Sequence, residues 1–245
     1  MFIRIASLVC VLAVAAILVP AQVDAATIVR FTVAGGAGSF DIELNDNTPK
    51  HRDNFIRYIE AGLYNNTIFH RSVDDQFKVL QGGGFTLPAD PNTSFLDPVV
   101  TYDPVAYEGN LGWSNTIKMV GAARTSDPNS ATSQWYINMA DNSSMFDDPG
   151  QSGMYGYTVF GRIVSGWDVA VTLFAAKKWD WTRVLGDPTF NWLPLWSSYD
   201  GGRWPMQDEF LTIQTGEVLP AHMPEPATMA MLALGLCGMA LRRRK

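Results

Sequence analysis

The chain has 245 residues, 47% of them hydrophobic, a formal net charge of −6 and two cysteines. The acidic balance argues against nucleic acid or an anionic membrane surface as a partner, because both attract clustered lysine and arginine. Cys10 and Cys237 lie in terminal segments that we expect to be removed, which excludes disulfides, a cysteine nucleophile and thiolate metal sites from the mature protein.

Residues 1–25 predict a secretory signal peptide. Arg4 precedes an apolar run over residues 5–19, and a short Val-Asp-Ala stretch leads to a cleavage site before Ala26. A charged start, an apolar centre of this length and a small-residue exit are the three parts of such a signal. The run is also short for a membrane span, which needs about 20 residues. An uncleaved anchor is the alternative.

The first elements of the mature chain are two predicted strands and a helix. Residues 27–33 and 39–44 are rich in β-forming residues, and the glycines over residues 35–38 predict a hairpin connection. Thr48 as N-cap and Pro49 at the first helical position predict the start of a helix. Its apolar residues recur at helical spacing, and Gly62 ends it.

Three motifs then place polar and aromatic residues on strands. Phe69, His70 and Arg71 come first, Gln81 follows ten residues after the arginine and opens a run of glycines, and residues 134–138 read Gln-Trp-Tyr-Ile-Asn. An arginine, a glutamine and an aromatic residue on three strands would make a shallow apolar pocket with one cation. Such a pocket has almost nothing that breaks a covalent bond, but it can hold a proline ring.

The second half of the mature chain predicts one more helix, over residues 166–176, and a closing strand over residues 210–213. Many short strands with two helices predict a mostly β domain, a closed barrel with helices over its open ends. Between these two elements lies a segment rich in tryptophan. Its members are Trp179, Trp181, Trp192, Trp196 and Trp204.

The C-terminal residues 221–245 contain a second targeting signal. Pro224, Glu225 and Pro226 precede an apolar segment over residues 229–241 and a basic tail over residues 242–245. This order resembles the PEP-CTERM sorting signal of Gram-negative bacteria, which implies cleavage by an exosortase-type processing enzyme and only transient membrane association. We therefore expect an exported protein, in the periplasm or at the cell surface or extracellular matrix. An ordinary tail anchor is the alternative reading.

The strand motifs resemble those of the cyclophilins, the peptidyl-prolyl cis-trans isomerases. The resemblance is continuous from residue 27 to about residue 176 and resumes over residues 205–220. It implies a closed eight-stranded antiparallel β-barrel capped by two α-helices. The domain would occupy residues 26–220, with a Trp-rich insertion at about residues 177–204. The implied partners are proline-containing peptides and unfolded exported proteins.

The implied reaction is rotation about the peptide bond before proline. That rotation has a barrier of about 18–20 kcal/mol because resonance shares the nitrogen lone pair with the carbonyl. A guanidinium that donates a hydrogen bond to the prolyl nitrogen favours the twisted amide, and an apolar pocket seats the ring. The chemistry therefore requires no cofactor, metal, general base or nucleophile.

The resemblance assigns roles to individual residues. It implies that Arg71 is the catalytic arginine and that Gln81 orients it and contacts the substrate, while His70 is a scaffold residue. Tyr136 stands where the family commonly has phenylalanine, so its hydroxyl needs a partner if it is buried. The predicted substrate-binding residues are Phe77, Val79, Thr125, Gln134, Tyr136, Phe146 and Tyr157.

One departure from the family pattern lies between Arg71 and Gln81, where the chain has about two extra residues. The family's other pocket aromatic would then fall on Lys78, and Phe77 would reach the pocket only through a bulge. Asp74 and Asp75 would also add negative charge beside the arginine and favour an ion pair over substrate.

Two classes of function follow from these patterns. The first is an exported isomerase that assists folding. The second is a catalytically weak cyclophilin-fold binding module of the cell surface or matrix, which the acidic pair before Gln81 favours. In a narrower version the tryptophan-rich segment binds polysaccharide through Trp192 and Trp196. The alternative for that segment is a satellite core packed over the barrel.

Overall fold

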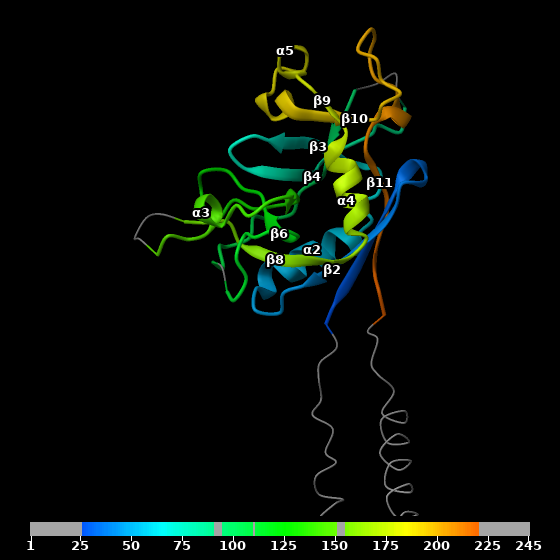
Figure 1. Cartoon of the computed structure of the whole chain (residues 1–245). Coiled ribbons are helices and arrows are strands. Elements are labelled where there is room, and N and C mark those ends of the chain that lie inside the picture. Colours follow the sequence, from blue (N-terminus) through cyan, green and yellow to red (C-terminus); the bar gives the residue numbers. More distant parts are fainter. Residues whose placement is uncertain (1–25, 91–94, 110, 151–154, 221–245) are drawn as a thin grey trace, which may run out of the picture. The chain divides into compact units, whose positions relative to one another are not determined.

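The computed structural model describes residues 26–90, 95–109, 111–150 and 155–220 (Figure 1). Ala26–Pro220 forms one compact unit by itself. Every strand of the barrel described below belongs to it, so the barrel is complete without the two terminal segments. The predicted signal peptide and sorting signal lie outside the described residues. Within the described part of the chain, no helix has the length and apolar character needed to cross a membrane.

Eight antiparallel strands close into a barrel, as expected. Going round the barrel the order is β3-β11-β1-β2-β8-β6-β7-β4, and pairing of β3 with β4 closes the ring. Closure pairs every strand of this ring on both sides. A short ninth strand, β5 (Asp97–Pro98), pairs with β4 outside the ring. The barrel strands are β1 (Ile28–Val33), β2 (Gly38–Leu44), β3 (Thr67–Asp74), β4 (Lys78–Thr86), β6 (Met119–Ala122), β7 (Trp135–Asn138), β8 (Val159–Ser165) and β11 (Thr212–Val218).

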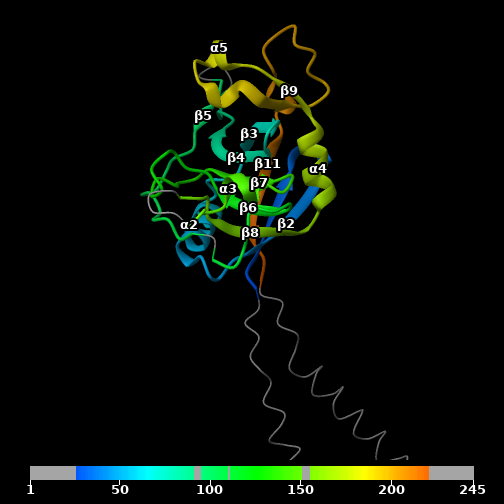
Figure 2. The same ribbon diagram turned by 60° about the vertical axis from the view of Figure 1, so that its left-hand side comes forward.

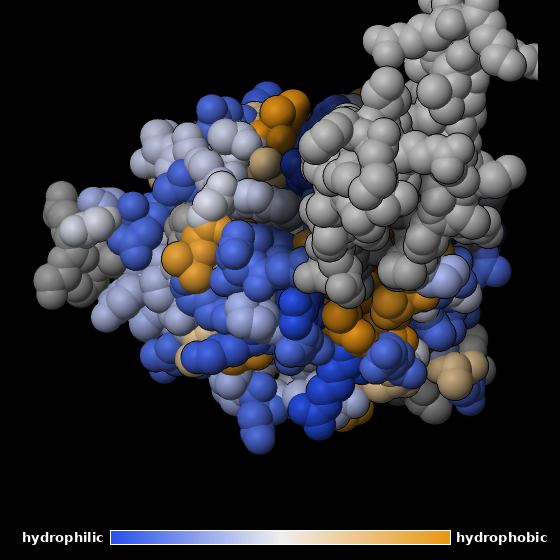
Figure 3. Space-filling model, turned by 90° about the horizontal axis from the view of Figure 1, so that it is seen from below, coloured by the Kyte–Doolittle hydropathy of each residue, from blue (hydrophilic) through white to orange (hydrophobic). Residues whose placement is uncertain are grey.

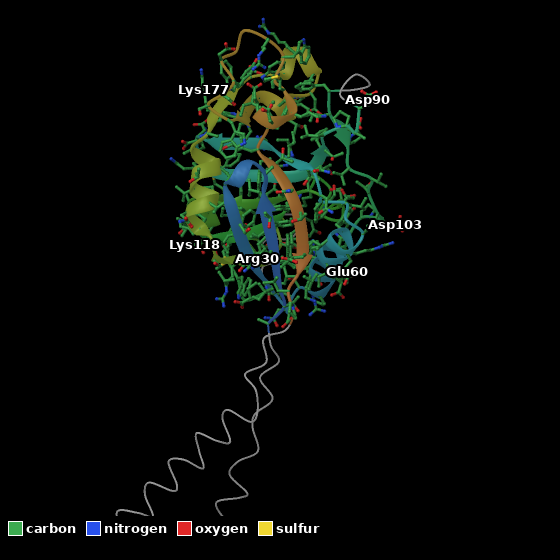
Figure 4. The ribbon with its side chains drawn as sticks, turned by 90° about the vertical axis from the view of Figure 1, so that its right-hand side faces the viewer. Arg30, Glu60, Asp90, Asp103, Lys118 and Lys177 are labelled. Atoms are coloured by element: carbon green, nitrogen blue, oxygen red, sulfur yellow. The ribbon has the colours of Figure 1, made fainter. Side chains whose placement is uncertain are left out.

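The two predicted helices are α2 (Pro49–Glu60) and α4 (Trp167–Ala175). They lie on opposite sides of the barrel (Figures 2 and 4). Each buries one face in the barrel core, with Phe55 among the residues of α2 and Leu173 among those of α4. The remaining helical segments are short: η1 (Ala34–Gly36), α3 (Ser143–Phe146), α5 (Thr182–Leu185), η2 (Pro188–Trp192) and η3 (Gln207–Glu209).

The start of α2 corrects the sequence expectation. Thr48 occupies the N-cap position, but its hydroxyl donates to the carbonyl of Asn45 at 3.2 Å and caps no helical N–H. The carboxylate of Glu108 accepts instead from the backbone N–H groups of Lys50 and His51, at 3.0 and 2.9 Å. A negative charge at the positive end of the helix dipole satisfies these donors. The cap therefore comes from a loop far away in the sequence.

The interior of the barrel is filled by aromatic side chains. Trp135 of β7 is 1% exposed, and its ring lies 5.3 Å from that of Phe31, 5.7 Å from that of Phe55 and 5.8 Å from that of Phe69. A small barrel of this kind is a packed core rather than a container. A binding site on this domain must therefore use the outer face of the strands or the loops.

The tryptophan-rich segment forms a second hydrophobic cluster over β3 (Figure 1). Strands β9 (Lys177–Trp179) and β10 (Leu193–Leu195) pair in a separate two-stranded sheet. We call its buried group the covered cluster. It matches the satellite core, one of the two alternatives for this segment. The covered cluster consists of Ile68, Trp181, Phe190, Leu193, Leu195, Tyr199 and Phe210.

The closing strand also differs from the expectation. It was expected over residues 210–213, but β11 begins at Thr212 and continues to Val218. Phe210 instead makes an isolated bridge to Leu195 and belongs to the covered cluster. The strand extends further because its polar second half pairs with β1, which hydrophobicity alone does not reveal. The visible part of the face in Figure 3 is largely hydrophilic, with apolar side chains in separate patches.

Candidate active site

Residues from the three sequence motifs lie in one row across neighbouring strands. Arg71 of β3 is directly opposite Gln81 of β4, which is opposite Tyr136 of β7, which is opposite Gly121 of β6. Residues directly opposite each other in antiparallel strands project to the same face. Because Trp135 points into the core and side chains alternate along a strand, this shared face is the outside of the barrel.

Arg71 is a half-buried cation without a counter-ion among the described residues. Its Nε atom is buried and has no hydrogen-bond partner there, and none of the ion pairs described includes it. Burial lowers the pKa of Arg71 from its ordinary value, although a guanidinium stays protonated at neutral pH. Asp74 forms its ion pair with Lys78, at 2.7 Å. The expected pairing of the acidic residues with Arg71 is therefore wrong.

Four aromatic rings beside Arg71 form a connected group, which we call the ring cluster: Phe77, Tyr136, Phe146 and Tyr157. The rings of Phe77 and Phe146 are 5.1 Å apart, and that of Phe146 is 5.6 Å from Tyr136 and 5.1 Å from Tyr157. Phe77, Phe146 and Tyr157 pack against a buried group made of Val73, Val79 and Tyr136 itself. The guanidinium carbon of Arg71 lies 5.9 Å from the centre of the Phe77 ring. An apolar surface and one cation thus lie together.

The two extra residues lengthen the β3–β4 hairpin instead of forming a bulge near the turn. Pairing is continuous from Arg71 opposite Gln81 to Asp74 opposite Lys78. The chain then turns, and the N–H of Asp75 donates to the carbonyl of Phe77 at 3.3 Å. Phe77 reaches the ring cluster from this turn. Phe77 therefore needs no bulge between Arg71 and Gln81 to reach the ring cluster, and its part in substrate binding stays a prediction.

The two glutamines of the motifs bond to each other. Nε2 of Gln81 donates to Oε1 of Gln134 at 2.8 Å. The glycine run beside them provides close packing: a Cβ on Gly84 would lie 2.9 Å from the amide carbon of Gln134. A Cβ on Gly121 would likewise overlap the ring of Tyr136. Glycine at both positions lets the site residues lie flat against the backbone.

The hydroxyl of Tyr136 has the partner that its burial requires. It donates to Oδ1 of Asn115 at 2.8 Å, and burial raises the pKa of Tyr136 well above its ordinary value, so it stays protonated. The buried Asn115 amide nitrogen donates to Oδ1 of Asp147 at 2.9 Å and to the carbonyl of Tyr157 at 3.1 Å. Asn115 therefore ties together three segments of the site. No sequence signal marked this residue, because a single asparagine in a polar loop is unremarkable.

Two hydrogen bonds, one from α2 and one from the loop after it, hold the segment before Gln134 in place. The amide of Asn54 donates to the carbonyl of Thr132, and the hydroxyl of Tyr64 donates to that of Ser133, both at 2.8 Å. These residues also line a cavity of about 10 Å³, which has room for little more than one water molecule. That cavity is too small for a proline ring. The ring cluster on the outer face is the better candidate for a substrate site.

Thr125 and His70 stay outside the ring cluster. Thr125 is exposed, and its hydroxyl lies 2.7 Å from that of Ser130. Its neighbour Arg124 places its guanidinium 4.5 Å from the centre of the Tyr157 ring, so Thr125 lies at the rim of the site. His70 is fully buried against Phe85. Burial, and then the charge of Arg71, lowers the pKa of His70 to about 4, so this residue is uncharged at neutral pH.

Two family models match the chain. Residues 28–187 match the cyclophilin type peptidyl-prolyl cis-trans isomerase model, and residues 224–245 match the PEP-CTERM protein-sorting motif. The first match covers more than half of the chain. The second agrees with the tripartite C-terminal signal and implies export from a Gram-negative cell.

Characterised proteins are similar over the same region. Peptidyl-prolyl cis-trans isomerase cyp18 of Streptomyces antibioticus is 38% identical over 142 residues, which cover 58% of this chain and 80% of that protein. Peptidyl-prolyl cis-trans isomerase A of Dickeya dadantii is 39% identical over 147 residues, with 60% and 71% covered. Peptidyl-prolyl cis-trans isomerase B of Escherichia coli is 39% identical over 127 residues, with 51% and 71% covered.

A solved structure shares the fold. It is a cyclophilin type peptidyl-prolyl cis-trans isomerase of Cryptosporidium parvum, crystallised in the presence of the dipeptide Ala-Pro. The TM-score is 0.51 at 20% sequence identity, and the match covers 79% of this chain and 99% of that one. At this identity the likeness supports the barrel architecture alone.

Proposed function

The chain belongs to the cyclophilin-type peptidyl-prolyl cis-trans isomerase family, and we propose that it catalyses X-Pro bond rotation in exported proteins through Arg71. The observation that carries this proposal is the half-buried Arg71 guanidinium beside the ring cluster, with no counter-ion among the described residues. A cation held in apolar surroundings interacts more strongly with a developing lone pair than it would in water.

The proposed mechanism needs only binding and one hydrogen bond. The proline ring sits on the ring cluster, with Tyr136 as its floor and Phe77, Val79, Phe146 and Tyr157 around it. Arg71 donates to the prolyl nitrogen as the amide twists and its lone pair returns to that atom. Because this hydrogen bond exists only in the twisted state, it lowers the barrier without tightening ground-state binding. Gln81, opposite Arg71 and bonded to Gln134, orients the guanidinium and contacts the peptide.

The proposed substrates are unfolded exported proteins. The C-terminal sorting motif supports this, because it implies that the chain is exported. Newly exported proteins fold outside the cytoplasm, so this protein would meet them there. An exosortase-type enzyme would process residues 221–245 after transient membrane association, and a signal peptide over residues 1–25 would start export. The mature domain of residues 26–220 would then act in the periplasm or at the cell surface. The acidic balance of the chain argues against a nucleic-acid partner on electrostatic grounds.

The test is direct exchange spectroscopy by NMR on a short X-Pro peptide with the Ala26–Pro220 unit. We expect Arg71→Ala to lower kcat/KM by about 100-fold, the effect of removing one preorganised donor to a transition state. Arg71→Lys should recover little, because a lysine cannot reproduce the guanidinium geometry. The matched control is Arg183→Ala, which removes an exposed arginine of the tryptophan-rich segment.

A binding module is the second candidate function, and the lengthened hairpin between Arg71 and Gln81 is the observation that favours it. In that case the cis-trans exchange of the peptide would be no faster with the wild-type unit than in buffer alone. The unit would nevertheless bind the peptide. Equal rates for wild type and Arg71→Ala, both well above buffer, would overturn the role of Arg71 while leaving the isomerase activity in place.

A further inference from the structure

The five tryptophans of residues 177–204 divide into three groups, one of which is Trp196 alone, packed against the barrel core. Trp179, Trp181 and Trp204 pair with rings of the covered cluster or with each other: Trp179 lies 4.9 Å from Tyr199, and Trp181 lies 5.1 Å from Trp204. Trp192 instead packs against the group of Val73, Val79 and Tyr136, the same buried side chains that support the ring cluster. One residue of the tryptophan-rich segment therefore lies at the candidate active site.

The backbone that carries Trp192 is firmly held. Trp192 is the last residue of η2, which packs on β3. Leu193, the next residue, is 0% exposed, and Phe190, two residues earlier, is 4% exposed. Both belong to the covered cluster, so the chain on either side of the indole is anchored. A side chain presented from an anchored backbone loses little conformational entropy when a ligand packs against it.

The Trp192 indole is also only partly covered. It is half-buried, and among the aromatic rings of the described chain none forms a ring pair with it. By contrast, Trp181 is 9% exposed and pairs with two other tryptophan-segment rings. An aromatic surface that is fixed in place and open to solvent beside a peptide site is suited to contact with an apolar side chain.

We propose that Trp192 is a specificity-determining residue, which contacts an apolar or aromatic side chain flanking the proline of the bound peptide. This inference rests on the function proposed above. Arg71 and Val73 lie two positions apart on β3, a separation of about 7 Å in a strand. An extended peptide whose prolyl nitrogen lies at Arg71 covers that distance in about two residues. Because Trp192 packs against the cluster that contains Val73, we place it within reach of the positions next to the proline.

The test uses a peptide panel in which one phenylalanine moves through the two positions on each side of the proline, with alanine elsewhere. For at least one position we expect Trp192→Ala to lower kcat/KM by about fivefold to tenfold, as an aromatic contact worth about 1 kcal/mol predicts. The all-alanine peptide should change by less than about twofold, since it makes no such contact. Trp192→Phe should restore most of the preference.

Trp204→Ala is the matched control, because Trp204 is 54% exposed and packs with the covered cluster. It should leave the peptide preference unchanged. If Trp192→Ala lowers the rates for all peptides by one common factor, or changes none of them, Trp192 only supports the fold and the proposal is wrong.

A binding measurement separates this inference from the proposed function. The indole N–H resonance of Trp192 is assigned by its loss in Trp192→Phe, and the wild-type unit is titrated with the phenylalanine peptides and with the all-alanine peptide. A shift with a phenylalanine peptide alone supports the contact, even if the wild type shows no isomerase activity. An active wild type without such a selective shift overturns the contact and leaves the isomerase function standing.

Discussion

Two stretches of the outer face of β3 and β4 both carry aromatic neighbours, but one is covered by other residues and the other is half-exposed. Around Ile68, His70 and Phe85 the face is covered by residues 177–204 and belongs to the covered cluster or contacts it. Around Arg71 and Gln81 the same two strands stay half-exposed. Aromatic content therefore does not mark a site on this barrel. What distinguishes the second stretch, among the described residues, is a half-buried cation with no counter-ion.

We call the first stretch the covered half and the second the open half. This difference predicts that substitutions in the covered half reduce stability without changing turnover, and that turnover falls only when a ring of the open half is displaced. Lost turnover per folded molecule after a substitution in the covered half would contradict the division. Four substitutions test it, beginning with the one that should change the protein most.

Leu193→Ala should cost the most stability. The side chain is 0% exposed in the covered cluster, and truncating a buried leucine lowers the free energy of unfolding by about 2–5 kcal/mol. Urea denaturation measures this loss, while the rate per folded molecule on an all-alanine peptide should stay the same. Val184→Ala in the same segment, at 53% exposure, should change stability by less than about 0.5 kcal/mol.

His70 should make the domain sensitive to acid. Its pKa is about 4 in the folded state, below its ordinary value of 6.5. Between these two pH values His70 is therefore protonated in the unfolded chain and neutral in the folded one. This contribution to stability is present above pH 6.5 and is lost as the pH falls towards 4, by about 3 kcal/mol in total. The measurement is the free energy of unfolding against pH for wild type and His70→Gln. Parallel curves for the two proteins would show that the burial of His70 has no such effect.

Gly121→Ala should damage the open half. The added Cβ would overlap the ring of Tyr136, and displacing a site residue by about 1 Å lowers the rate by up to about 100-fold. Peptide exchange by NMR measures the rate, and thermal unfolding shows whether the barrel survives. Gly202→Ala is the control, because the nearest atom to its Cβ is a flexible Asp200 oxygen at 3.5 Å. Unchanged turnover in Gly121→Ala would place the floor of the pocket elsewhere.

Tyr136→Phe should have the smallest effect on turnover. The ring stays, but Oδ1 of Asn115 loses one of its two donors and keeps that of Asn138, at 3.2 Å. The loss of one buried hydrogen bond lowers the free energy of unfolding by about 1 kcal/mol. Turnover should stay within about twofold of wild type, since the apolar face that meets the proline is the same. A large loss of activity would instead assign the hydroxyl a part in binding.

Much of the fold could be predicted from the sequence, because its signals are local or are carried by motifs. The hairpin glycines, Pro49 at a helix start and the apolar spacing of both helices lead to the elements observed. The family motifs predicted the closed eight-stranded barrel and named the residues that now lie around Arg71. Those roles remain predictions that the experiments above test.

The amino-acid sequence was therefore enough to predict the barrel, its two helices and the C-terminal sorting motif, and to name candidate site residues whose roles stay predictions. The folded chain was needed to show that Phe77 arrives from a lengthened hairpin, that Asn115 holds Tyr136, that Glu108 caps α2 and that Trp192 joins the site. Each of these contacts joins residues through strand register, loop return or the packing of an inserted segment. Such contacts depend on barrel closure and leave no periodic pattern in the chain.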